Sequence, residues 1–146
     1  IKSSAASDVY KRQEVNWING VLRQYSSRDA IIITHSYLKK SASYTTQGKA
    51  IFEKIVKANP NVFLVLCGHC RDISYKNVQL DDDGDGDPDR TVYAILSNFQ
   101  GSKAGGGGYM RILDFRDSDI YIYTYSPYYD SCEYPKGKTE ATVPLP

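Results

Sequence analysis

Hydrophobic and polar positions in the first half of the chain follow two different periods. In the segment 14–25, EVNWINGVLRQY, the residues Trp17, Val21 and Leu22 share one face at helical spacing, which predicts an amphipathic helix. The next apolar segment, Ala30–Thr34, reads AIIIT and has β-branched residues on both faces. Such a continuous run is typical of a strand buried on both sides, as in a parallel sheet.

A second helix and a second strand follow after a polar stretch. Residues 35–47 lack apolar periodicity and predict a loop, whereas residues 48–58 predict a helix with Ile51 and Ile55 facing inward. An Asn-Pro-Asn sequence ends this helix, and Val62–Cys67 is again apolar throughout. The order helix–strand–helix–strand predicts an α/β fold in which a right-handed crossover joins two parallel strands.

The second half of the chain has the pattern of a β-rich region. Residues 81–90, DDDGDGDPDR, form an acidic segment rich in turn residues. Three strand-like segments follow at 91–98, 109–115 and 120–125, and we expect them to form an antiparallel meander. Residues 128–146 show no period and predict an irregular tail.

The start of the chain has the pattern of a translated adaptor, with a natural flexible Ser/Ala-rich tail as the alternative. Ser3–Gln13, SSAASDVYKRQ, resembles the in-frame translation of a transposase sequencing adaptor. We therefore expect residues 1–13 to be foreign to the natural protein and residues 14–127 to form part of a domain whose upstream portion is missing.

Composition excludes several classes of protein. The chain has 146 residues with 41% hydrophobic and 24% charged residues, which is ordinary for a globular domain. Its net charge of +1 gives no electrostatic argument for nucleic acid binding, and no apolar run is long enough to span a membrane. Three cysteines do not make a disulfide framework.

The two histidines of the chain occupy equivalent positions. His35 directly follows the first predicted strand, and His69 follows the second after one glycine. Because ligands of open α/β sheets bind beyond the carboxyl ends of parallel strands, we expect both imidazoles to face one crevice. A histidine with a purely structural role is the alternative for each position taken alone.

Five segments together resemble the C-terminal half of a calcineurin-like metallophosphoesterase. They read WINGVL, IIITHSYL, NPNVFLVLCGHC, TVYAILSNFQ and GGGGYMRILDF, and they extend from Glu14 to Pro127. The resemblance implies an α/β fold that is half of an α/β/β/α sandwich, with helix–strand–helix–strand followed by antiparallel strands. It also implies a phosphatase or phosphodiesterase that hydrolyses a phosphoester substrate with the help of two divalent metals.

The resemblance assigns roles to four residues. His35 and His69 would bind the same one of the two metals, which would be Mn, Fe or Zn, and Gly68 would let the backbone turn so that His69 faces the site. Arg71 stands where the family has a second histidine, and a guanidinium cannot ligate a metal. Either one metal is then sufficient, or Arg71 contacts the substrate phosphate as a bidentate donor. The remaining family ligands belong to DxH, GDxxD and GNH motifs, which we expect upstream of this chain.

The letters CGHC, residues 67–70, support a different hypothesis. They also resemble the active site of thiol–disulfide oxidoreductases, in which the first thiol lies at a helix N-terminus. The sequence after Cys70 contains Ile73, Tyr75 and Val78 followed by an Asp/Gly run, and this is poor helix material. A buried structural role for Cys67 is the simpler interpretation.

The acidic segment is a candidate calcium loop. Carboxylates stand at alternate positions, and a glycine follows the third of them, as at the start of a calcium-binding loop: Asp81, Asp83, Asp85, Asp87 and Asp89. A solvated hairpin loop is the alternative. Bound calcium would suit an extracellular or cell-envelope location, and a calcium-stabilised binding module without enzymatic activity is the alternative to the hydrolase.

Overall fold

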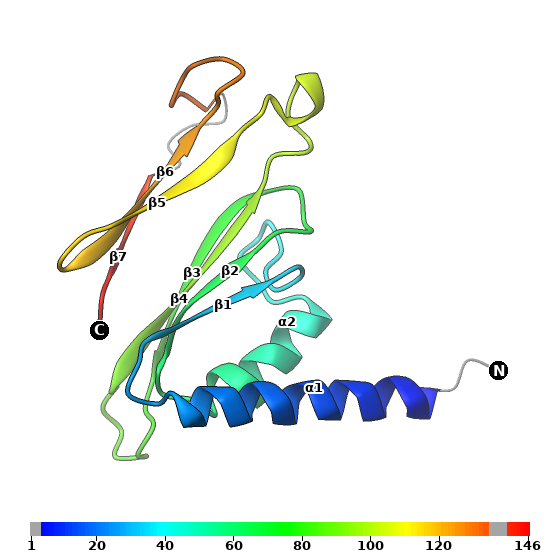
Figure 1. The fold of residues 1–146 in the computed structure, drawn as a ribbon, viewed down its shortest axis with the longest axis vertical. Coiled ribbons are helices and arrows are strands. Elements are labelled where there is room, and N and C mark those ends of the chain that lie inside the picture. Colours follow the sequence, from blue (N-terminus) through cyan, green and yellow to red (C-terminus); the bar gives the residue numbers. More distant parts are fainter. Residues whose placement is uncertain (1–3, 135–139) are drawn as a thin grey trace.

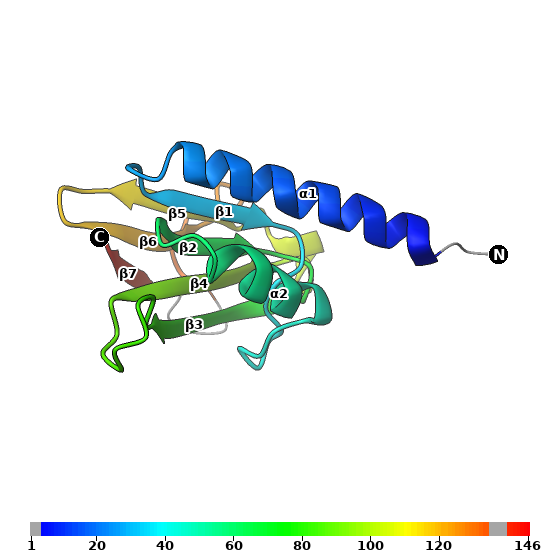
Figure 2. The ribbon, with the colours of Figure 1, turned by 90° about the horizontal axis from the view of Figure 1, so that it is seen from below.

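The protein forms three layers in a computed structural model that describes residues 4–134 and 140–146, with side chains from Arg12 onward. Two helices cover one face of a four-stranded sheet, and a three-stranded sheet covers the opposite face (Figures 1 and 2). The fold is therefore mixed α/β, as the sequence predicts. The elements are α1 (Ser4–Gln24), β1 (Ala30–Thr34), α2 (Thr46–Ile51), a π-helical turn (Phe52–Val56), β2 (Val62–Cys67), β3 (Asp72–Leu80), β4 (Arg90–Asn98), a 3₁₀ turn (Ala104–Gly106), β5 (Met110–Phe115), β6 (Asp119–Tyr125) and β7 (Ala141–Pro144).

The four-stranded sheet has the strand order β1-β2-β4-β3. Strands β1, β2 and β4 are parallel, which confirms the predicted pairing of the first two, and β3 runs antiparallel to β4. Thr34 pairs with Cys67, and Cys67 pairs with Leu96, so β1 and β2 end at the same level and β4 continues beyond them to Asn98. This common edge, which we call the carboxyl rim, carries the candidate site.

Strand β2 supplies side chains to two hydrophobic cores. Val62, Val65 and Cys67 face the helices, whereas Phe63 and Leu64 face the three-stranded sheet. Two consecutive residues point the same way because the register with β1 shifts at this point, where Ala30 pairs with Val62 and Ile31 with Leu64. The bulge explains why β2 is apolar throughout: both of its faces are covered.

Helix α1 differs from its predicted form in length and in orientation. It begins at Ser4 rather than at residue 14, since SAASDVYKRQ contains no Gly or Pro to end a helix. Of the predicted apolar face, only Leu22 is buried, while Trp17 is 70% exposed and Val21 is 37% exposed. The stripe that packs on the core is instead Val15, Ile18 and Leu22.

Helix α2 begins two residues earlier than predicted because Thr45 caps it. The Thr45 hydroxyl accepts a hydrogen bond from the backbone of Gly48, in the standard geometry of an N-cap. The helix then continues as the π-helical turn, which buries Phe52, Ile55 and Val56. The inward orientation predicted for Ile55 is confirmed.

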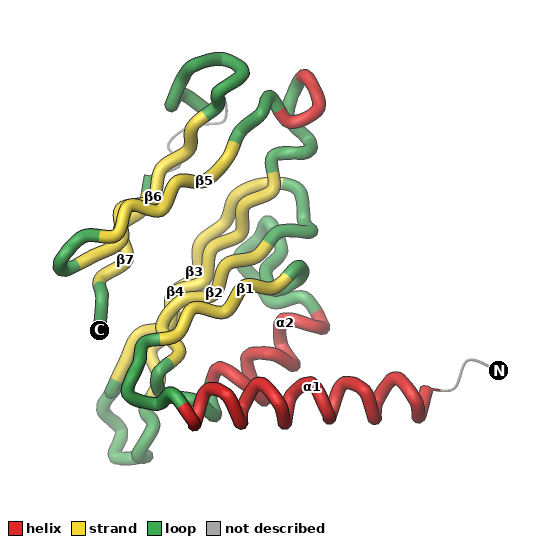
Figure 3. The backbone as a smooth tube through the Cα atoms, viewed as in Figure 1, coloured by secondary structure: helices red, strands yellow, loops and turns green. Residues whose placement is uncertain are grey.

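Two expectations for the second half of the chain are wrong, and one strand was not predicted. The unpredicted strand is β3, residues 72–80, on which Ser74 and Leu80 are buried. The predicted three-stranded meander does not exist, because β4 lies between β2 and β3 in the first sheet, while β5 and β6 pair with each other (Figure 3). The expected irregular tail contains β7, whose Val143 is buried against β6.

Candidate functional site

His35 and His69 meet at the carboxyl rim. The Nε2 atom of His35 lies 3.0 Å from the Nδ1 atom of His69, and the ring centroids are 4.8 Å apart with the rings edge-on. Both side chains are exposed, so their nitrogens are accessible from solvent. The structure thus confirms the predicted meeting of the only two imidazoles of the chain.

The distance between the two nitrogens fits a shared metal ion. Nitrogens that bind one metal at about 2.05 Å lie roughly 2.9 Å apart at right angles and roughly 3.3 Å apart at the tetrahedral angle. The observed 3.0 Å falls between these values. It also suits a hydrogen bond from one neutral imidazole to the other, so geometry alone leaves both arrangements possible.

The backbone that presents His69 is strained at the histidine itself. His69 has a φ of 61°, whereas Gly68 lacks a positive φ, and a Cβ added at Gly68 would meet nothing closer than 3.9 Å. The predicted role of Gly68 is therefore wrong: the left-handed conformation falls on the histidine. A non-glycine residue in this region costs of order 1 kcal/mol, and such strain is typical of functional sites.

Hydrogen bonds from neighbouring strands hold this conformation. The Gly68 N–H donates to the His35 carbonyl (3.1 Å), which ties the two strand ends together. The side-chain amide of Asn98 donates to the His69 carbonyl (2.9 Å), and its oxygen accepts from the Gln100 N–H (3.0 Å). Asn98 is a positioning residue to which sequence reasoning gave no role; its place at the end of β4 was the available signal.

The two histidines open into a pocket of about 460 Å³. Its walls come from the ends of all three parallel strands and from the glycine-rich segment before β5. The residues that line it are His35, Gly68, His69, Ser97, Asn98, Phe99, Gln100, Gly105, Gly106, Gly108 and Tyr109. We call this space the histidine pocket.

Arg71 is exposed and lies beside the histidine pocket rather than in it. Within the described part of the chain it is absent from the pocket lining, and a Cβ added at Gly101 would lie 3.3 Å from the Arg71 Cδ. The described lining of the pocket therefore does not include Arg71, and its contact with phosphate stays a prediction.

The cysteines of CGHC lack the environment of a redox centre. Cys67 is buried, and burial raises the pKa of its thiol, whereas a reactive thiol needs a lowered pKa. After Cys70 the chain enters β3, so CGHC does not open a helix as the redox motif would require. Neither Cys67 nor Cys70 is part of a disulfide.

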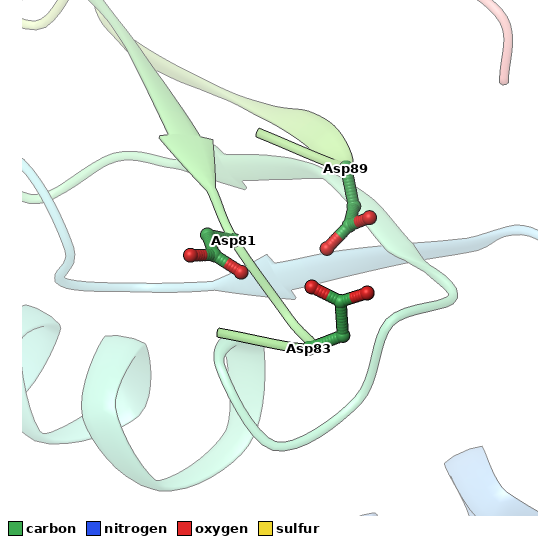
Figure 4. A group of neighbouring side chains, drawn as sticks. All are labelled: Asp81, Asp83 and Asp89. Atoms are coloured by element: carbon green, nitrogen blue, oxygen red, sulfur yellow. The ribbon is translucent and has the colours of Figure 1, made fainter. Parts of the chain in front are cut away.

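Carboxylates of the acidic loop between β3 and β4 converge as the calcium hypothesis requires, although not all five take part. Asp81, Asp83 and Asp89 each have a carboxylate oxygen within 4.8 Å of the others (Figure 4). No other group of three or more His, Cys, Asp or Glu side chains comes this close together among the described residues. The same loop is also stabilised as a turn. The carboxylate of Asp81 accepts hydrogen bonds from the Gly84 and Gly86 N–H groups, which lower its pKa.

Calorimetry of the chain with millimolar calcium tests this loop. If the three carboxylates bind the ion, Asp83→Ala is expected to abolish the heat of binding, because it removes one ligand of the group. Asp87→Ala is the matched control, since it removes the same charge from the same loop outside the group. Equal heats for both variants would show that the loop is only a turn.

Comparison with known proteins gives no established function. No family model matches the chain. The chain is 44% identical over 118 residues to the uncharacterized protein YvnB of Bacillus subtilis (strain 168). The matched residues are 80% of this chain but only 9% of that protein, so the chain corresponds to a small part of the relative's length.

The described helices also bear on a membrane location. None of them combines the length and the apolar character that crossing a bilayer demands.

Proposed function

We propose that this chain is part of a metal-dependent phosphoester hydrolase and supplies two ligands to one divalent transition metal. The 3.0 Å separation of the His35 and His69 nitrogens carries the proposal. Three further observations support it: the pair lies at the carboxyl rim of parallel strands, His69 is held in a strained conformation, and a pocket adjoins both rings. The finer fold assignment, half of an α/β/β/α sandwich, belongs to the same proposal.

The residues of the chain have defined parts in such a site. His35 and His69 would hold the metal through Nε2 and Nδ1, respectively, and Asn98 would keep the His69 backbone in place. A bound divalent metal polarises the phosphoryl group and lowers the pKa of a bound water. Since two imidazoles do not complete a coordination sphere, the remaining ligands would come from other parts of a longer protein. Manganese, iron and zinc all accept imidazole nitrogen.

A zinc titration followed by nuclear magnetic resonance of the two imidazoles tests the proposal. We expect both histidines to shift together at one equivalent of Zn²⁺, because they share the ion. Cys67→Ser/Cys70→Ser is the control: it removes the nearby thiols and is expected to leave the titration unchanged. A response from one imidazole alone, or a response that disappears in the cysteine variant, would contradict the shared site.

The proposed phosphoester hydrolysis would require a longer protein that contains this chain. We expect the 146-residue chain to hydrolyse no chromogenic phosphodiester, because among the described residues no third His, Cys, Asp or Glu ligand joins His35 and His69. The protein encoded together with its upstream sequence is expected to hydrolyse it. Robust turnover by the short chain would contradict this division of the site.

A further inference from the structure

A second pocket adjoins the histidine pocket and has a different chemical character. It has a volume of about 690 Å³ and shares Tyr109 with the histidine pocket. Three tyrosines line this pocket, and we call them its wall: Tyr109, Tyr129 and Tyr134. Polar and charged side chains also line it, and we call them its rim; they include Ser102, Lys103 and Glu133. We call this space the tyrosine groove.

Two of the three tyrosine rings, Tyr109 and Tyr134, are held by neighbouring groups. Tyr134 is buried and packs edge-on against Tyr109 with ring centroids 5.0 Å apart. The Tyr109 hydroxyl donates to the Glu133 carbonyl (3.1 Å), and the hydroxyls of Tyr134 and Ser102 lie 3.1 Å apart. Because these two rings are held before any ligand arrives, their ordering costs little conformational entropy on binding.

The glycine-rich segment builds both pockets at once. Gly107 has a φ of 59°, and a Cβ added there would lie 2.7 Å from the Tyr129 ring and 2.9 Å from the Tyr109 ring. The tyrosines therefore need glycine at this position in order to stand where they do. Its neighbours Gly106 and Gly108 line the histidine pocket. The two pockets are consequently two ends of one continuous surface.

The exposed part of the Tyr129 ring determines what shape of ligand fits. Tyr129 is 46% exposed, and its ring centroid is 5.9 Å from that of Tyr109 and 4.8 Å from that of Tyr128, which packs edge-on. A planar ring inserted between two others needs roughly 7 Å, twice the van der Waals contact distance, so no ring fits between Tyr129 and either neighbour. A planar ligand would instead stack on the part of the Tyr129 ring that these two neighbours leave exposed, with its polar edge toward the rim.

We propose that the tyrosine groove binds the base of a nucleoside phosphoester whose phosphate lies in the histidine pocket. A nucleobase combines a flat face with hydrogen-bond donors and acceptors along its edge, which matches a tyrosine wall rimmed by hydroxyls, an ammonium group and a carboxylate. The proposal rests on the proposed function for the phosphate end only. The base end depends on the tyrosines alone.

Adenosine, which lacks a phosphate, is the probe for the groove, and its binding to the whole chain is measured by ligand-observed magnetic resonance. Tyr129→Ala is expected to weaken adenosine binding about tenfold, as removal of one stacking partner does elsewhere. Tyr129→Phe keeps the flat ring and should bind adenosine normally. Tyr25→Ala is the matched control, because Tyr25 is similarly exposed, at 47%, in the turn that follows α1.

Two results would contradict base binding in the tyrosine groove. The first is equal affinity for adenosine in the parent chain and in a folded Tyr129→Ala variant. The second is that Tyr129→Ala weakens the binding of glucose 6-phosphate as much as that of adenosine. His35→Ala separates the groove from the hydrolase. It is expected to leave adenosine binding unchanged and to remove the zinc-dependent gain in affinity of adenosine 5′-monophosphate. If zinc gives the parent chain no gain in affinity while adenosine binding still depends on Tyr129, the base-binding role of the groove is supported and the proposed metal site is refuted.

Discussion

Replacing His35 by alanine is expected to lower the affinity of the chain for Zn²⁺ at least tenfold. The Nε2 atom of His35 is one of two nitrogens placed 3.0 Å apart, and its loss leaves His69 as a single, weak ligand. Since changes to groups that only orient a ligand already reduce metal affinity by roughly 10- to 100-fold, loss of a ligand itself should cost no less. Isothermal titration calorimetry of the parent chain and the variant measures the effect.

The control for this experiment is Cys132→Ser. Cys132 is an exposed free thiol outside the described lining of the histidine pocket, and its removal shows whether adventitious thiol binding contributes to the heat. Equal zinc affinity in the parent chain and in a folded His35→Ala variant would mean that the two imidazoles share a hydrogen bond and no metal.

Replacing Gly48 by alanine is expected to destabilise the fold by about 3 kcal/mol or more. A Cβ at this position would lie 2.0 Å from the Tyr37 carbonyl oxygen and 2.7 Å from the Tyr37 Cα, and both atoms belong to the backbone. No side-chain rotation relieves such a clash, so the segment that follows His35 must move. Urea denaturation followed by circular dichroism gives the change in the free energy of unfolding.

Gly20→Ala is the matched control for the second prediction. Gly20 lies on the exposed side of α1, and an added Cβ there meets nothing within 4 Å. Alanine favours a helix over glycine by about 0.5–1 kcal/mol, so this variant should be slightly more stable than the parent chain. A Gly48→Ala variant as stable as the parent would contradict the tight crossing of α2 and the His35 segment.

The sequence was sufficient to place β1, β2 and the two histidines. AIIIT and VFLVLC are apolar on both faces, and this pattern arises where a parallel strand is covered by helices on one side and by a second sheet on the other. Once both strands were placed side by side, the residues after them had to meet at one rim. The pairing of His35 with His69 follows from this topology without any side-chain detail.

Other features depended on contacts that no local pattern encodes. The strand-like residues 91–98 predicted a strand but not its partners, and β4 joined β2 and β3 instead of β5 because side chains on both of its faces are covered. The helical spacing of Trp17 predicted a buried side chain, yet α1 turns a neighbouring stripe toward the core. The positive φ was expected at Gly68, the residue type that tolerates it best, and occurs at His69.

The outer edge of the four-stranded sheet has a consequence for the site. Strand β1 pairs with β2 on one side, and within residues 4–134 and 140–146 no strand pairs with its other side, where Ile33 is 79% exposed. A further parallel strand that joined β1 and ended level with Thr34 would bring its next residue beside His35. Backbone pairing alone would then enlarge the set of donor atoms for the proposed metal without reshaping any loop. The open edge thus leaves the sheet extensible next to the proposed site.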